Sequence, residues 1–299
     1  MPRFTDIGSY VTGLPTQDER GFLVLSIDEL AEKKVPHCVI IAWEAGKFLS
    51  TTQKGWLLAD LVQAPPYHDE HLLFLGTHGQ YLEKDVHGER NERISGPGIA
   101  ISDRGPLRCA RTIAGIVYVV GGDRQAYRLS AERGWQSLDQ GLGLPGDEGK
   151  IFSLEAVDGF AADEIYAVGL RGEIWLYNGS VWQNITSPTN LLLSAVCCAS
   201  DDNVYAAGLQ GLLLRGRHDS WEVIDVGEFP YDIWDLCWFK GALYLATQYR
   251  VYRLDGEVLT PLDSGADSAG KLACTDTVLW SIGAKDVLAF DGQTWSRID

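Results

Sequence analysis

The sequence DEIYAVGLRGEIWLYNGSVWQNI, Asp163 to Ile185, is followed by a second version of itself, DNVYAAGLQGLLLRGRHDSWEVI, Asp202 to Ile224. Each version contains an acidic turn, a short apolar strand, a Gly-x-x-Gly turn, a second strand, a polar turn and a strand that opens on tryptophan. Tyr166 and Tyr205 lie 39 residues apart. Self-similarity at a fixed period of this size indicates an array of supersecondary units.

The repeat continues on both sides of this pair. An aromatic residue opens the second strand of each unit, and these residues recur at intervals of 36 to 48 residues: Phe74, Tyr118, Tyr166, Tyr205, Tyr244 and Trp280. Short strands in units of about 40 residues are typical of β-propeller blades. A weaker unit, Val39 to Leu61, precedes them. The sequence therefore predicts an all-β fold, a single β-propeller of seven four-stranded blades, with six blades as the alternative.

The repeat divides the chain into an N-terminal segment, residues 1–36, and the propeller proper, residues 37–299, within one structural domain. Phe22 to Leu25 reads as a strand, and Ser26 to Glu29 reads as a capping box that predicts a short helix within residues 26–35. The N-terminal segment is expected either to cap the first blade or to complete it. The last unit, Lys271 to Ile298, contains all four of its own strands.

Charge and hydropathy limit the classes of function. The chain has 299 residues and a net charge of −16, which argues against binding the backbone of a nucleic acid, since that requires a basic face. No run approaches the ~20 apolar residues of a membrane span, and the N-terminus, MPRFTDIGSY, lacks the apolar core of a signal peptide. We therefore expect a cytoplasmic protein.

The six cysteines have no paired metal-binding spacing such as C-x-x-C. Cys109, Cys197, Cys237 and Cys274 precede a repeat anchor, where the first strand of a blade is expected. The sequence predicts that these four thiols are buried, reduced and free of metal.

Sequence signatures of catalysis or of cofactor binding are absent. There is no G-x-S-x-G nucleophile motif and no phosphate-binding or dinucleotide fingerprint. His68-Asp69-Glu70-His71, with His78 nearby, offers loosely spaced metal ligands, but a solvated turn is the favoured interpretation. We therefore predict a non-enzymatic protein without a cofactor or metal.

The pattern D-x-Y/W-A-V-G-x-x-G-x-I-x-x-Y/D-N/D-G-x-x-W resembles the repeat of bacterial β-propellers of the BNR-like and kelch-like class. Asp163 to Trp182 matches it nearly throughout, and Asp202 to Trp221 matches it with a divergent outer turn. This resemblance implies the architecture and hardly constrains the function. The Asp-box turn of sialidase-type propellers, S-x-D-x-G-x-x-W, is absent, so the resemblance gives no support to a glycosidase.

One loop departs from the repeat by its content of aromatic residues interleaved with carboxylates. Loops between blades carry function in a propeller, so we predict a partner-binding surface here, with the aromatic side chains as anchors and the carboxylates steering the approach. The alternative is that Trp234 and Trp238 pack in the channel or against a neighbouring blade. The predicted surface comprises Glu228, Phe229, Tyr231, Asp232, Trp234, Asp235 and Trp238, together with Asp147 and Glu148 in another acidic loop and Arg171 in a Gly-x-x-Gly turn.

These observations favour a protein that binds another protein, which we expect to be basic, and neither nucleic acid nor a membrane. The sharper hypothesis is an immunity-type inhibitor that neutralises a basic toxin or nuclease domain by covering its active site. The alternatives are a propeller enzyme or small-ligand binder with a site at the central channel, and a complex-assembly factor. A toxin-like neighbouring gene would favour the first hypothesis, and a metabolic operon would favour an enzyme.

Overall fold

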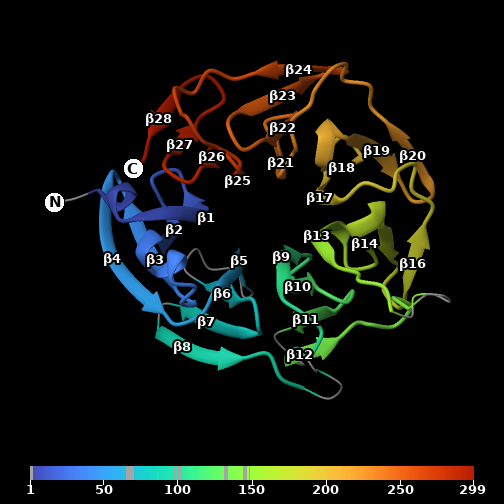
Figure 1. Cartoon of the computed structure of the whole chain (residues 1–299), viewed down its shortest axis with the longest axis horizontal. Helices are drawn as coiled ribbons and strands as arrows, with labels where there is room; N and C mark the ends of the chain where they lie inside the picture. The colour runs from blue at the N-terminus through green and yellow to red at the C-terminus, as the bar shows by residue number, and fades with distance from the viewer. Residues whose placement is uncertain are drawn as a thin grey trace. The chain divides into compact units, whose positions relative to one another are not determined.

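Seven four-stranded antiparallel sheets account for the strands of the chain, and each sheet takes four strands that are consecutive in the sequence (Figure 1). The computed structural model describes residues 3–64, 71–85, 87–96, 99, 101, 103–130, 134–143, 147 and 149–299. This organisation confirms the all-β prediction and decides for seven blades over six. We number the blades 1 to 7 in chain order. The chain divides into two compact units, residues 59–224 and residues 1–58 with 225–299.

The unit of residues 59–224 contains blades 2 to 5. Blades 4 and 5 are the two quoted repeats, and each has a short 3₁₀ turn between its second and third strands: η2 (Leu170–Gly172) and η3 (Leu209–Gly211). The strands of this unit are β5 (Leu58–Gln63), β6 (Leu72–Gly76), β7 (Gln80–Asp85), β8 (Gly88–Arg93), β9 (Leu107–Ile113), β10 (Ile116–Gly121), β11 (Ala126–Ser130), β12 (Gly134–Ser137), β13 (Leu154–Ala161), β14 (Glu164–Gly169), β15 (Ile174–Tyr177), β16 (Trp182–Ile185), β17 (Leu193–Cys198), β18 (Val204–Gly208), β19 (Leu213–Arg217) and β20 (Ser220–Val223).

The other unit contains blades 1, 6 and 7. Its two helical segments are η1 (Phe4–Asp6), before the first strand, and α1 (Asp28–Glu32), between the second and third strands of blade 1. The strands are β1 (Gly8–Gln17), β2 (Arg20–Ile27), β3 (Cys38–Glu44), β4 (Lys47–Lys54), β21 (Asp235–Phe239), β22 (Ala242–Ala246), β23 (Val251–Asp255), β24 (Val258–Pro261), β25 (Lys271–Cys274), β26 (Leu279–Ile282), β27 (Val287–Phe290) and β28 (Trp295–Arg297).

The first blade corrects the expected boundaries of the repeat. Residues 8–54 form blade 1, so the N-terminal segment completes this blade with β1 and β2. The weak unit predicted from Val39 to Leu61 is therefore wrong, because it joins β3 and β4 of blade 1 to β5 of blade 2. The sequence misled because α1 lies between β2 and β3, the place where blades 2, 4 and 5 have the Gly-x-x-Gly turn.

The predicted helix is present as α1, but the predicted capping box is not formed. Ile27, the residue before the helix, is the last residue of β2 and has no capping side chain. His37 takes over this role, because its Nε2 accepts the Ile27 N–H at 2.7 Å and lies 3.3 Å from the Ser26 hydroxyl. The Ser26 hydroxyl, which was expected to cap the helix, thus lies beside His37, which follows the helix in the sequence.

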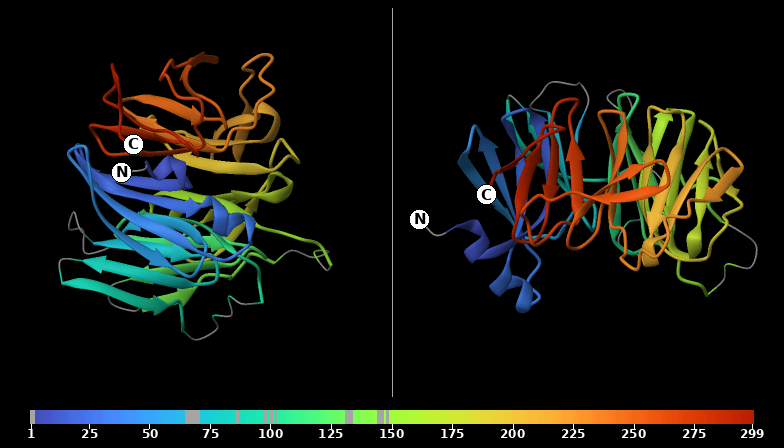
Figure 2. Two further views of the ribbon diagram at one scale, coloured as in Figure 1. Left: turned by 60° about the vertical axis from the view of Figure 1, so that its left-hand side comes forward. Right: turned by 90° about the horizontal axis from the view of Figure 1, so that it is seen from above.

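Blades 7 and 1 lie side by side within their unit. The Tyr10 N–H donates to the Ala284 carbonyl at 2.9 Å, and the rings of Trp43 and Trp280 meet edge to face at 5.6 Å. Lys285 reaches from blade 7 to the Asp28 carboxylate at 2.7 Å. Blade 7 keeps its own four strands, as predicted, and η1 lies near the C-terminal residue Asp299 (Figures 1 and 2).

The two glycines of the Gly-x-x-Gly turn are needed for different reasons. A Cβ on Gly169 would lie 1.9 Å from the Ser153 carbonyl oxygen, and one on Gly208 would lie 1.9 Å from the Leu192 oxygen. The second glycine adopts a left-handed conformation in both turns, with a φ of 70° at Gly172, which favours a residue without a side chain. Close approach thus explains the first glycine, and backbone conformation explains the second.

Candidate functional site

Exposed aromatic side chains gather at one end of blade 6. Tyr231 and Trp234, in the loop before β21, are 45% and 40% exposed, and Tyr249, in the turn between β22 and β23, is 54% exposed. A folded domain gains little from leaving such large apolar groups in water, so their concentration in one blade indicates a contact surface. We call this set the blade 6 aromatic surface and define it as Phe229, Tyr231, Trp234, Tyr249 and Tyr252.

Contacts among these residues hold the surface in shape. The Phe229 ring meets the Tyr231 ring edge to face at 5.5 Å and the Tyr252 ring at 4.9 Å. The neighbouring Ile233 is fully buried, and the Trp234 N–H donates to the Ala246 carbonyl at 2.8 Å. The exposed rings are therefore carried on an anchored backbone, which lowers the entropic cost of ordering them on binding.

The turn that carries Tyr249 is fixed by a buried threonine. Thr247 is 1% exposed, and its hydroxyl accepts the N–H groups of Tyr249 at 3.3 Å and Arg250 at 3.1 Å while donating to the Arg250 carbonyl. Tyr249 and Tyr252 were not among the residues predicted from the sequence. The Thr-x-x-Arg turn that replaces Gly-x-x-Gly in this unit was the available signal.

Carboxylates surround the same end of the unit. Glu228 lies in the loop before β21, and Asp263 and Asp267 lie in the loop before β25; all three side chains are exposed. Asp232 is half-buried. This arrangement gives the blade 6 aromatic surface an acidic rim within its own unit.

Asp235 has a structural position that the sequence interpretation missed. Its carboxylate accepts the Leu236 N–H at 2.9 Å and, from the first strand of the next blade, the Leu272 N–H at 3.0 Å. Asp60 and Asp158 make the same pair of bonds, to Ala110 and Cys198 of their following blades, at 2.8 Å each. We call this recurring arrangement the aspartate clasp, and it assigns Asp235 to the support of the blades.

Trp238 lies in β21 and is half-buried, so it is less accessible than Trp234. Its carbonyl oxygen lies 3.5 Å from the Cys274 thiol. The structure therefore brings Phe229, Tyr231 and Trp234 to one end of blade 6 and places Trp238 in the first strand of that blade. This placement fits the packing interpretation for Trp238.

The predicted residues of the other unit have separate surroundings. Asp147 forms an ion pair with Arg124, a buried side chain that also binds Glu173. Arg171 is exposed, with a left-handed φ of 64° in the turn η2. Glu148 lies outside the described residues. The Asp147 carboxylate is therefore committed to an internal cation.

The cysteines are free thiols. Cys197 and Cys237 are buried as predicted, whereas Cys109 and Cys274 are only half-buried, although both pack against apolar clusters. The Cys237 and Cys274 sulfurs, on neighbouring blades, lie 2.6 Å apart. Burial raises the pKa of the Cys38 thiol to about 12, which makes this thiol a poor nucleophile.

Within the described part of the chain, no group of three or more His, Cys, Asp or Glu side chains is arranged to hold a metal ion. His71 bonds to Glu83 at 2.8 Å, and His68, Asp69 and Glu70 lie outside the described residues. No helix among the described residues has the length and apolar character needed to cross a membrane.

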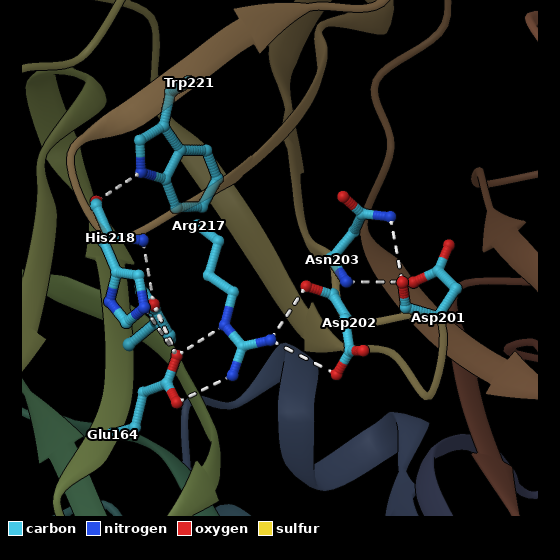
Figure 3. A network of polar contacts seen from close by, with 8 residues as sticks. Glu164, Asp201, Asp202, Asn203, Arg217, His218 and Trp221 are labelled. Carbon is cyan, nitrogen blue, oxygen red and sulfur yellow. Dashed lines mark hydrogen bonds and ion pairs between the residues drawn. The ribbon is translucent and has the colours of Figure 1, made fainter.

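A polar network joins blades 4 and 5 (Figure 3). The Arg217 guanidinium donates to both Glu164 oxygens at 2.8 and 2.9 Å and also to Asp202 at 3.2 Å. Tyr166 donates a third bond to Glu164 at 3.0 Å. The bonds from Arg217 hold the pKa of Glu164 below its usual value, although partial burial opposes the shift. The carboxylate is ionised and fully engaged, so it connects two blades and is not available as a catalytic base.

Comparisons with known proteins give a relative by sequence and solved structures of similar fold. No family model matches the chain. The immune protein Tsi7 of Pseudomonas aeruginosa is 39% identical over 308 residues that span the whole of both chains. Among solved structures, YCF48 from Cyanidioschyzon merolae aligns with a TM-score of 0.59 at 16% identity, over 80% of this chain and 84% of its own. The RRP9 WD40 repeats align with a TM-score of 0.67 at 10% identity, over 97% of this chain and 91% of theirs. At these identities the two structures support the propeller fold alone.

Proposed function

The chain belongs to the family of the immune protein Tsi7, and from this premise we propose that it neutralises a toxin protein by binding it and covering its active site. An immune protein acts by binding, so the chain is non-enzymatic. The single observation from which we choose the binding surface is the exposure of Tyr231, Trp234 and Tyr249 together on blade 6. Aromatic anchors of this kind supply most of the free energy in protein interfaces.

We propose that the toxin domain is basic. The blade 6 aromatic surface has an acidic rim, and the whole chain has a net charge of −16. Complementary charge raises the rate of encounter and orients the partner. A nuclease domain fits this description, because its substrate backbone is anionic and its own binding face must be basic.

Two further assignments follow from the sequence. We place the protein in the cytoplasm, where reduced thiols persist, because its six cysteines are free. We also assign its repeat to the bacterial BNR-like and kelch-like class. The quoted motif supports this assignment.

The proposal is tested with the toxin encoded in the adjacent reading frame. Purified wild-type protein is expected to bind this toxin and abolish its activity, and Trp234→Ala is expected to weaken binding by about 2 kcal/mol or more, mainly through faster dissociation. Val258→Ala is the matched control, because Val258 is an apolar residue of β24 with 65% exposure. Failure of the wild-type protein to bind the toxin would refute the function. Equal kinetics for Trp234→Ala and the control would refute the surface.

A further inference from the structure

The loop before β13 presents a cationic and apolar patch on a strongly acidic protein. Ile151 is 78% exposed, more than any other large hydrophobic side chain in the described part of the chain. Lys150 precedes it, Phe152 follows it, and the exposed Arg108 and Arg171 lie on β9 and in the turn η2. We define the blade 4 patch as Arg108, Lys150, Ile151, Phe152 and Arg171.

A pocket of about 460 Å³ opens beside the patch, between the start of β9 and the loop before β13. Its walls combine cationic and apolar groups with two carboxylates, Asp123 and Glu155. The lining residues include Arg104, Pro106, Arg108, Lys150, Phe152 and Leu192. A concave site with apolar walls and a few charged groups can take one side chain and orient it.

Each of the nearby carboxylates pairs with an arginine. Arg124 binds both Asp147 and Glu173, while Arg104 binds Asp123 and Asp139. Glu155 lies 3.5 Å from Arg108. Lys150 and Arg171 form no ion pair with any residue that the structure describes. Lys150 and Arg171 are therefore the exposed cations of the patch that remain available to a partner.

The patch rests on a rigid support. The Arg124 guanidinium lies over the Phe152 ring, 3.6 Å from its centroid, and Arg171 lies 5.7 Å from the same centroid. The Asp123 N–H donates to the Phe152 carbonyl at 2.9 Å, and Gly122 and Ser153 form an isolated β-bridge. These contacts hold Ile151 out from the surface, so its exposure is imposed by the fold.

Arg171 occupies a turn position that is not a cation in every blade. Blade 5 has the same turn, and its middle residue is also left-handed. That residue is Gln210, with a φ of 59°, whereas Arg171 at the same position of blade 4 has a φ of 64°. The turn geometry therefore does not require a cation. A left-handed conformation at a non-glycine residue is uncommon and costs energy, and here it points a guanidinium to the surface beside Ile151.

From this arrangement we propose that the blade 4 patch is a second contact for the toxin, and that it binds a carboxylate side chain of the toxin next to an apolar residue that packs on Ile151. The inference rests on the proposed function. Arg171 and Lys150 supply charge-assisted hydrogen bonds to the carboxylate, and Ile151, which stands next to the buried Phe152, supplies the apolar contact. The patch recognises a local acidic feature on a partner whose overall charge is basic, and it thereby contributes to specificity.

Binding of the purified toxin to four variants tests the proposal. Ile151→Asp introduces a like charge opposite the toxin carboxylate, and Arg171→Glu removes the guanidinium and does the same. Each is expected to raise Kd by about tenfold or more. Val258→Asp makes the same apolar-to-acid change at an exposed residue outside the patch, and Arg171→Lys keeps the charge. Both are expected to bind within about threefold of wild type. Thermal melting of each variant confirms that it is folded.

Charge reversals on the toxin identify the opposing group. Surface Asp and Glu residues of the toxin are changed singly to Lys. One of these toxin variants is expected to bind the Arg171→Glu protein tightly and the wild-type protein more weakly than the unchanged toxin does. Wild-type Kd values for both Ile151→Asp and Arg171→Glu, in a protein that still loses affinity on Trp234→Ala, would overturn this inference and leave the proposed function standing. Losses that no toxin reversal rescues would also overturn the carboxylate assignment. A wild-type protein that fails to bind the toxin would overturn both.

Discussion

The loops before β13 and β21 occupy the same place in the repeat but use charge in opposite ways. In the first loop, Asp147 pairs with Arg124, and Lys150 and Ile151 are the exposed charged and large apolar side chains among its described residues. In the second loop, Glu228 is exposed beside Tyr231. The comparison shows that acidity along the sequence does not indicate which carboxylates a partner meets. In the first loop, the buried Arg124 pairs with Asp147 and so makes this carboxylate unavailable to a partner.

Burial gives Arg124 this influence. The side chain is 5% exposed, and its carboxylate partner Glu173 is 10% exposed, so each charge has lost most of its water. A buried ion pair contributes little net free energy compared with apolar packing, but removing one partner leaves the other charge unpaired and is strongly destabilising. Loss of Arg124 is therefore expected to destabilise the first loop far more than loss of any exposed charge would destabilise the second loop.

Arg124→Met is the largest expected effect. The substitution leaves Glu173 and Asp147 without their cation, and it should lower the free energy of unfolding by about 3–5 kcal/mol. Chemical denaturation followed by tryptophan fluorescence measures the change. Arg171→Met is the matched control, because this exposed arginine has no ion-pair partner among the described residues, and it should change stability by less than about 0.5 kcal/mol. Equal effects of the two substitutions would show that Arg124 does not organise the loop.

Asp235→Ala is the next largest effect, and it separates support from recognition in the second loop. The substitution leaves the Leu236 and Leu272 N–H groups without their acceptor and should cost about 2 kcal/mol of stability. Asp263→Ala, at an exposed carboxylate of the next loop, should be nearly neutral. Both are measured by denaturant titration. A neutral Asp235→Ala would contradict the aspartate clasp and return this residue to the predicted binding surface.

Glu164→Gln tests whether the ion pair between Glu164 and Arg217, at the other end of the sheet, stabilises the contact between blades 4 and 5. The bonds from Arg217 hold the pKa of Glu164 below its unfolded value, with burial opposing. The stabilisation is therefore complete above the unfolded pKa of about 4.3 and is lost as the pH falls through the folded pKa. The substitution should cost about 1 kcal/mol at pH 7 and almost nothing near pH 2.

The control for this effect is Glu222→Gln in blade 5. Glu222 pairs with Arg215, but both side chains are largely in solvent, with exposures of 63% and 36%. This substitution should cost less than about 0.5 kcal/mol at either pH. Stability curves measured across the acid range distinguish the two carboxylates. A difference at Glu164 that does not shrink towards low pH would show that the network is not stabilised by its charges.

The repeat predicted the blades because blade packing is local. Each unit buries its own anchor, such as Tyr166 or Trp280, against the neighbouring sheets, so the pattern of every blade is visible in its own residues. Blade 1 was misassigned because α1 replaces the Gly-x-x-Gly turn between its second and third strands and so interrupts the unit.

The candidate site could be predicted only in part. The aromatic content of residues 229–234 was visible in the sequence, and the structure exposes Tyr231 and Trp234. The role of Asp235 was not visible, because its partner Leu272 lies 37 residues away on another blade. For the same reason the neutralisation of Asp147 by Arg124 was missed. Pairings between blades depend on tertiary contacts that local sequence does not encode.

Glu228→Lys is the smallest expected effect and the most direct test of the acidic rim. Exposed charges are screened within about 8–10 Å at physiological salt, so a single reversal changes the long-range attraction and leaves the aromatic contacts intact. The association rate with a basic toxin should fall about threefold at low salt, with little change in dissociation. The difference should disappear near 1 M salt, where the screening length is about 3 Å. Asp219→Lys makes the same charge change in the exposed turn between β19 and β20 and should slow association less. Stopped-flow association rates at several salt concentrations decide the outcome. If the two reversals slow association equally, the net charge of the protein attracts the toxin and the rim on blade 6 does not orient it.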